Sequence, residues 1–87
     1  MKNHKIRAEK IESRIGELAQ CSDEADCLSR VFGTRAFVEA QNKIESWMKE
    51  AGLQTYIDNI GNVRGKLFSE IPDAKTFVIA SHFDTVI

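Results

Sequence analysis

Residues 76–87 read TFVIASHFDTVI. The stretch opens with the apolar run Phe77–Ala80, and a short run of β-branched and aromatic residues is typical of a strand buried on both faces. It then becomes polar at Ser81, His82 and Asp84. In open α/β sheets, ligands bind at the carboxyl ends of the strands. The pattern therefore predicts a buried strand over residues 76–82 that delivers His82 and Asp84 to a site.

His82 and Asp84 are two residues apart, so an extended backbone would place both side chains on one face. An imidazole can ligate a metal through one ring nitrogen while a carboxylate holds the N–H of the other nitrogen. A structural histidine that merely bonds a neighbouring carboxylate would give the same pattern, and a zinc site needs three or four protein ligands. The pair alone leaves both interpretations open.

The composition limits the possible partners. The chain has 87 residues, 43% of them hydrophobic and 29% charged, which suits one small domain. Its net charge of −1 gives no electrostatic reason to expect nucleic acid or an anionic membrane as a partner. Cys21 and Cys27 are spaced neither as a metal pair nor as a redox motif, so we expect free thiols in a cytoplasmic protein.

Two helices are predicted before the hairpin. Residues 5–20 carry one narrow apolar stripe at helical spacing, which predicts a helix packed against a core: Ala8, Ile11, Ile15 and Leu18. The connection that follows contains Arg30, for which a solvated side chain is the default expectation. Residues 35–51 form the second predicted helix, with Thr34 as its N-cap. Gly52 is expected at its C′ position in a Schellman motif, and Trp47 is expected in the core.

Residues 54–68 predict a β-hairpin. Asn59–Asn62 supply its turn, because Asn and Gly tolerate positive φ, and Gly65 marks either a weak point or a close backbone approach. Pro72-Asp73 suits a type I turn before the strand at 76–82. The predicted fold class is α/β in the order α-α-β-β-β, with both helices on one side of a sheet made by the hairpin and the last strand.

Several segments together carry a family pattern. In chain order they are Ser29-Arg30, Ala40-Gln41, Trp47–Leu53, Asp58–Lys66 and Ser81–Val86. On these residues the sequence resembles the zinc-dependent amidohydrolases related to glutamate carboxypeptidase and aminoacylase. Within that superfamily it is most similar to the branch of allantoate amidohydrolase and N-carbamoyl-L-amino acid hydrolase. The likeness spans about two thirds of the chain, from Ser29 to Val86.

The resemblance implies roles for two residues. His82 matches a metal-ligand histidine, and Asp84 matches the carboxylate that orients its imidazole. In such enzymes two divalent metals activate a water, with zinc expected and manganese or nickel as alternatives, and a later glutamate is the general base. The implied reaction is hydrolysis of a C–N bond in a small ureido or N-carbamoyl substrate, and the complete enzymes are expected to be homodimers.

The family's bridging aspartate, general base and remaining ligands would all follow Ile87. We therefore expect residues 1–87 to be the incomplete N-terminal portion of a larger di-metal hydrolase catalytic domain, without tightly bound metal and without activity of their own. Two alternatives stay open. One is a metallopeptidase or acyl-amino acid hydrolase of the same superfamily, and the other is a non-enzymatic helix–hairpin module.

Overall fold

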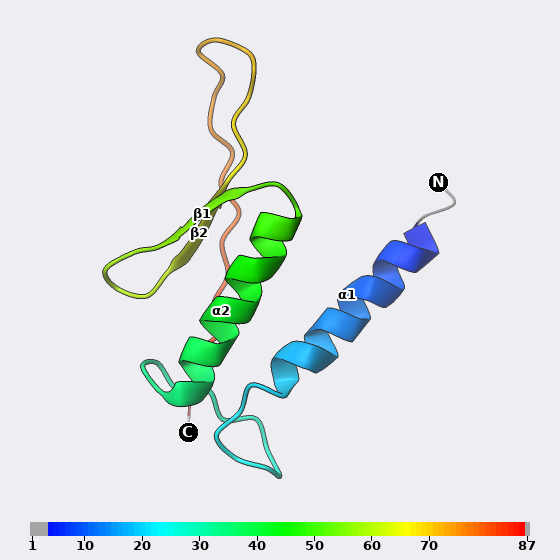
Figure 1. The fold of residues 1–87 in the computed structure, drawn as a ribbon, viewed down its shortest axis with the longest axis vertical. Helices are drawn as coiled ribbons and strands as arrows, with labels where there is room; N and C mark the ends of the chain where they lie inside the picture. The colour runs from blue at the N-terminus through cyan, green and yellow to red at the C-terminus, as the bar shows by residue number, and fades with distance from the viewer. Residues whose placement is uncertain (1–3, 87) are drawn as a thin grey trace.

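The computed structural model describes residues 4–86. The elements follow in the order α1 (His4–Ala19), α2 (Arg35–Glu50), β1 (Gln54–Ile57) and β2 (Val63–Lys66), as Figure 1 shows. The two strands form one antiparallel sheet, in which Gln54 pairs with Lys66 and Ile57 pairs with Val63. Both predicted helices and the predicted hairpin are confirmed. Neither helix is long and apolar enough to cross a membrane within the residues described.

Helix α2 begins and ends where its sequence predicts. The Oγ1 atom of Thr34 accepts a hydrogen bond from the backbone N–H of Phe37, as an N-cap does. At the other end Gly52 has a φ of 90° and donates its N–H to the carbonyl oxygen of Lys49. The N–H of Leu53 donates to the carbonyl oxygen of Met48 at 3.0 Å. These two bonds are the pair that defines a Schellman motif.

The core lies between α2 and the hairpin. Four residues of α2 are buried: Ala36, Phe37, Ala40 and Gln41. The Nε2 atom of Gln41 donates to the carbonyl oxygen of Gly61, 2.9 Å away, and so fixes the hairpin turn to the helix. A Cβ atom on Gly65 would lie 2.8 Å from the sulfur of Met48. Gly65 therefore marks the close approach of β2 to α2, one of the two roles predicted for it.

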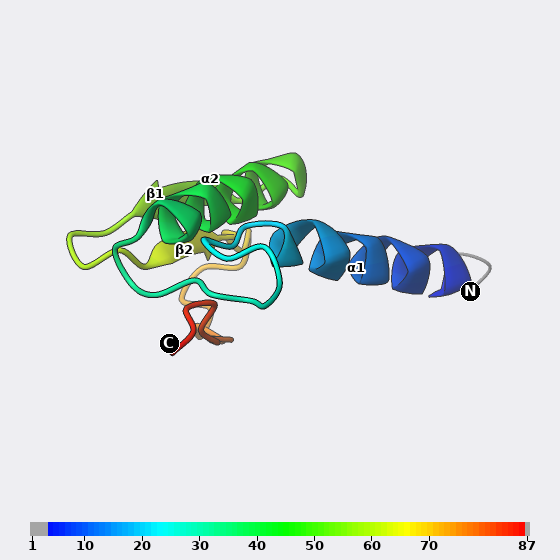
Figure 2. The ribbon, with the colours of Figure 1, turned by 90° about the horizontal axis from the view of Figure 1, so that it is seen from below.

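Helix α1 does not pack as predicted. None of its residues is buried, and Ile11 and Ile15 are 61% and 64% exposed. The helix meets α2 through Arg14, which lies 3.6 Å from a carboxylate oxygen of Glu50 and 5.2 Å from the centre of the Trp47 ring. Figure 2 shows α1 extending away from the layer formed by α2 and the sheet. The buried face of α2 is already occupied by the hairpin, so the stripe of α1 has no apolar partner there.

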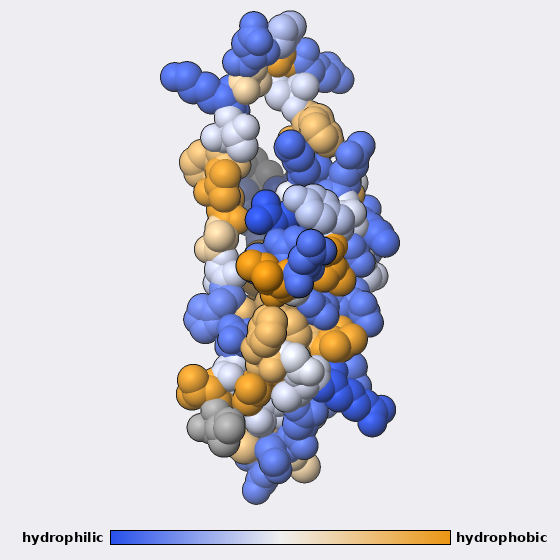
Figure 3. Space-filling view, turned by 90° about the vertical axis from the view of Figure 1, so that its left-hand side faces the viewer, coloured by the Kyte–Doolittle hydropathy of each residue, from blue (hydrophilic) through white to orange (hydrophobic). Residues whose placement is uncertain are grey.

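The predicted buried strand over residues 76–82 is not formed. Residues 75–86 adopt neither helix nor strand, and Phe77 and Ile79 are each 85% exposed. A strand buried on both faces needs neighbouring strands, and β1 and β2 pair only with each other in the part of the chain described. Apolar residues are accordingly visible along the length of one face in Figure 3. The fold within residues 4–86 is a two-stranded antiparallel sheet covered by α2, compatible with an α/β fragment.

The turn before this segment also differs from the prediction. The N–H of Ala74 donates to the carbonyl oxygen of Ile71 at 3.3 Å, which closes a four-residue turn around Pro72 and Asp73. Asp73 has a φ of 59°. A positive φ at this position belongs to a type II turn, whereas the sequence predicted type I. Asp is one of the few residues other than Gly that tolerate this conformation, through its short polar side chain.

Candidate functional site

Residues 82–85 are anchored to the start of α2 although they form no strand. The ring of Phe83 stacks on the ring of Phe37, with 4.7 Å between the ring centres and 17° between the planes. Phe37 also lies against Phe32, with 4.9 Å between the ring centres and a tilt of 55°. Aromatic pairs in these arrangements add to the free energy of burial. The aromatic cluster therefore places the neighbouring polar residues beside the N-terminus of α2.

The structure brings His82 and Asp84 together as the sequence predicts. The Nδ1 atom of His82 lies 3.1 Å from the backbone oxygen of Asp84 and 3.2 Å from its Oδ1 atom. Both partners are hydrogen-bond acceptors, so the nitrogen between them must carry the ring proton. In the neutral imidazole Nε2 then keeps its lone pair. The His82 side chain is 84% exposed, which leaves this lone pair open to a ligand.

Arg30 is buried, contrary to the solvated side chain that the sequence suggested. It is only 5% exposed. Its Nη1 atom donates to the backbone oxygens of Leu18 and Cys21, at 2.7 and 3.1 Å. Its Nε atom donates to the backbone oxygen of Phe83 at 2.7 Å. These carbonyl groups replace the water that the guanidinium loses on burial. The Arg30 side chain therefore links the end of α1 to the backbone of Phe83.

Thr85 completes the link between Arg30 and the site. Its Oγ1 atom accepts a hydrogen bond from the backbone N–H of Arg30 at 2.7 Å. Its own backbone N–H donates to the carbonyl oxygen of Arg30 at 2.8 Å. Residues 30 and 83–85 are therefore joined through both main chain and side chain, across more than fifty positions of sequence.

The donor set of the site suits one ligand of a metal rather than a complete coordination shell. Within residues 4–86, no three His, Cys, Asp or Glu side chains are close enough to hold an ion together. Cys21 is a buried free thiol and Cys27 an exposed one, and His4 lies on α1. The pair of His82 and Asp84 fits the predicted role of a ligand with its orienting carboxylate. Further ligands would have to come from outside the described residues.

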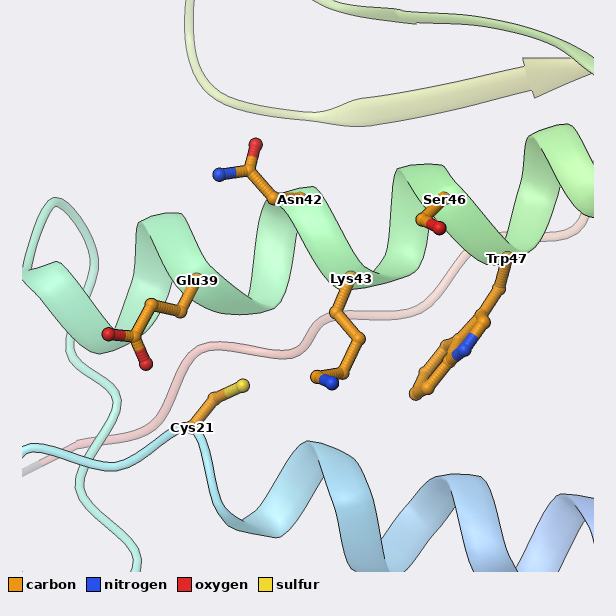
Figure 4. A pocket seen from close by; sticks show the side chains of 6 residues that line it. All are labelled: Cys21, Glu39, Asn42, Lys43, Ser46 and Trp47. Atoms are coloured by element: carbon orange, nitrogen blue, oxygen red, sulfur yellow. The ribbon is translucent and has the colours of Figure 1, made fainter.

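A shallow groove between α2 and the end of α1 is a separate feature (Figure 4). It is lined by Cys21, Glu39, Asn42, Lys43, Ser46 and Trp47. Neither His82 nor Asp84 lines it. The indole of Trp47 lies 5.2 Å from the guanidinium of Arg14 and 5.9 Å from the ammonium of Lys43. These distances are in the range of cation–π attraction. Trp47 is only half-buried and lies against two cations, so the prediction that it belongs to the core is wrong within the described residues.

Comparison with known proteins shows which proteins this chain is similar to. No family model matches the chain, and no solved structure matches it. Curated proteins do match, and their names are those of amidohydrolases and deiminases.

The matching proteins come from plants and bacteria. The chain is 40% identical over 75 residues to allantoate deiminase 2 of Glycine max, covering 86% of this chain and 16% of the relative. It is 36% identical over 78 residues to the allantoate amidohydrolase of Bacillus subtilis, covering 88% of this chain and 19% of the relative. It is 33% identical over 82 residues to the N-carbamoyl-L-amino-acid amidohydrolase of Paenarthrobacter aurescens, covering 94% and 20%.

These matches confirm the predicted resemblance to the allantoate amidohydrolase and N-carbamoyl-L-amino acid hydrolase branch. The chain spans between a seventh and a fifth of the length of the curated relatives it matches, 14% to 20% of each.

Proposed function

We propose that this chain contributes to the catalytic domain of a metal-dependent amidohydrolase that hydrolyses a C–N bond of a ureido or N-carbamoyl substrate. The observation that carries the proposal is the pairing of His82 with Asp84, with Nε2 exposed, in a sequence related to enzymes named for allantoate and N-carbamoyl amino acids. Allantoate and N-carbamoyl-L-amino acids are therefore the substrates to test first. We propose a cytoplasmic homodimer as the state of the complete enzyme.

In this proposal His82 binds a divalent metal through Nε2, with zinc first and manganese or nickel as alternatives. Asp84 accepts the Nδ1–H, which fixes the tautomer, holds the ring plane and raises the basicity of Nε2. A metal at this position would supply Lewis-acid chemistry toward the carbonyl of the substrate. The part of the reaction that belongs to the described residues is to hold and orient one ligand.

The number of ligands predicts that the isolated chain is inactive. A catalytic zinc takes about three protein ligands. The part of the chain that the structure describes brings one histidine and one carboxylate together, and the carboxylate bonds the imidazole. We therefore propose that the 87-residue chain neither binds zinc tightly nor turns over substrate by itself.

Calorimetric titration with zinc tests this part of the proposal. We expect binding of the 87-residue chain to be weaker than about micromolar, because one ligand replaces only part of the hydration of the ion. An ammonia-release assay on allantoate and N-carbamoyl-L-amino acids should show no turnover. Sub-micromolar binding that depends on His82, or turnover by the pure chain, would contradict the proposed incomplete site.

A chimera tests the role of His82 in catalysis. In the allantoate amidohydrolase of Bacillus subtilis, the segment that this chain matches would be replaced by all 87 residues of this chain, so that both His4 and His82 are present. We expect the chimera to release ammonia from allantoate and His82→Ala to abolish the release. The matched control is His4→Ala, which removes the other histidine, on α1, and should leave the rate unchanged. A chimera with His82→Ala that keeps its activity would refute a metal-ligand role.

A further inference from the structure

We infer that Arg30 is a positioning residue for the pair of His82 and Asp84, an inference that rests on the proposed function for its chemical meaning. Arg30 contacts neither side chain of the pair. It binds the backbone on both sides of Asp84, through Phe83 and Thr85. The orientation of the His82 ring then depends on a residue more than fifty positions away.

Two peptide planes carry this effect. A peptide group is planar, so a hydrogen bond to its N–H also orients its carbonyl. The N–H of Thr85 and the carbonyl of Asp84 belong to one peptide group. The carbonyl oxygen of Arg30 holds that N–H at 2.8 Å, and the Asp84 oxygen on the same plane lies 3.1 Å from Nδ1 of His82. Arg30 thereby aims one of the two acceptors that hold the ring proton.

The second peptide plane joins Phe83 to Asp84. Its carbonyl oxygen accepts the hydrogen bond from Nε of Arg30 at 2.7 Å. The side chain of Arg30 thus holds the peptide before Asp84, and its main chain holds the peptide after it. With both flanking planes fixed, the Asp84 backbone has little freedom to rotate, and its carboxylate stays 3.2 Å from the imidazole.

The chemistry of the buried cation explains why an arginine is required. Nη1 and Nε point to different acceptors, at the end of α1 and at Phe83 respectively. A rigid guanidinium can serve such diverging acceptors at once, whereas a lysine ammonium is a single point on a flexible stem. The acceptor Leu18 lies in the last turn of α1, where the helix dipole favours a positive charge. We therefore expect Arg30→Lys to restore the geometry only in part.

The tautomer of His82 in the 87-residue chain is the test, measured from the ring nitrogen shifts by NMR. The shifts are read from the neutral ring, in which only one of the two nitrogens carries a proton. We expect the native chain to carry the ring proton on Nδ1. In Arg30→Met the proton should move in part to Nε2, with Arg30→Lys between the two. Arg35→Met is the matched control, because the Arg35 side chain is 88% exposed, and it should change nothing.

Amide hydrogen exchange separates positioning from general stabilisation. In Arg30→Met the Thr85 amide should exchange at least about tenfold faster, because the segment that carries its acceptor is loosened. The helical amides of α2, such as that of Ala40, should keep their rates. Equal acceleration of both sets with an unchanged tautomer would show that Arg30 only stabilises the fold, and would overturn the inference.

A second pair of variants covers the case in which Arg30→Met does not fold. Thr85→Val removes the acceptor of the Arg30 N–H and keeps the shape of the side chain. Thr55→Val is its control, because Thr55 Oγ1 is buried without a hydrogen-bond partner among the described residues. We expect a partial tautomer shift in the first variant and none in the second. Identical ring shifts in both would overturn the inference. The NMR and hydrogen-exchange measurements use neither metal nor substrate, so they test the role of Arg30 alone. A failure of the proposed function would instead appear as an inactive chimera with the Bacillus subtilis enzyme.

Discussion

Asp58 is the residue on which the hairpin turn depends. Its Oδ1 atom accepts hydrogen bonds from the backbone N–H groups of Ile60 and Asn62, and its Oδ2 atom accepts from the side chains of Asn62 and Arg64. These bonds favour the ionised carboxylate. They lower the pKa of Asp58 from 3.8 to about 2, with the Asn62 side chain as the largest cause and partial desolvation as the opposing one.

The lowered pKa of Asp58 predicts an acid-sensitive hairpin. A carboxyl group whose pKa is lower in the folded state stabilises it above the unfolded pKa, here 3.8, and the stabilisation is lost as the pH falls toward about 2. The chemical shifts of β1 and β2 should therefore lose their strand character between about pH 4 and pH 2. Asp58→Asn should be less stable at neutral pH and should lack this transition. The control Asp73→Asn, in an exposed turn, should keep the acid transition of the hairpin. An unchanged transition in Asp58→Asn would refute its assignment to the Asp58 carboxyl group.

At the same scale, the sequence predicted some contacts and missed others for one physical reason. His82 and Asp84 are two residues apart, so a local pattern was enough to predict their pairing. The acceptors of the Arg30 side chain are 9, 12 and 53 residues away from it. No local pattern marks such a contact, because the chain must fold before the carbonyl groups converge. The sequence therefore predicted the pairing of His82 with Asp84 and missed the burial of Arg30 against the backbone of Phe83.

At the scale of elements, local signals decided which predictions held. Thr34 and Gly52 mark the ends of α2 by hydrogen bonds within a few residues, and the turn of the hairpin is equally local. Helix α1 formed as predicted, but the burial of its stripe required a partner surface that sequence periodicity does not specify. The strand predicted at residues 76–82 depended on neighbouring strands in the same way.

Replacing glycine by alanine should change stability in opposite directions at Gly16 and at Gly52. Gly16 lies inside α1, where an added Cβ atom meets nothing within 4 Å, so Gly16→Ala should raise the stability of the helix by up to about 1 kcal/mol. Gly52 has a φ of 90°, so Gly52→Ala should destabilise the end of α2 by about 1–2 kcal/mol. Circular dichroism with thermal and urea unfolding measures both changes. Loss of stability in Gly16→Ala would contradict its place inside α1, and no loss in Gly52→Ala would contradict the assigned end of α2.

At the scale of the whole molecule, the exposed apolar segment at residues 77–79 predicts self-association. Phe77, Val78 and Ile79 are 85%, 77% and 85% exposed, and an unpaired apolar segment of high β-propensity is an aggregation hazard. Sedimentation velocity should show association that grows with concentration. Ile79→Lys should reduce it without lowering the unfolding midpoint.

Ile60→Lys is the matched control for this prediction. Ile60 is 70% exposed in the hairpin turn, so the substitution adds the same charge outside the apolar segment. We expect it to leave most of the association in place. A native chain that stays monomeric at high concentration, or equal rescue by both lysine variants, would show that residues 77–79 do not drive association.

The metal content of the chimera described above tests the central claim most directly, because it reports ligation by His82 without depending on turnover. By elemental analysis, His82→Ala should lose the metal at one site, and Asp84→Ala should bind that metal about 10–100-fold more weakly. His4→Ala should match the unmodified chimera. Full metal occupancy and unchanged affinity in His82→Ala would contradict the claim that His82 is a metal ligand.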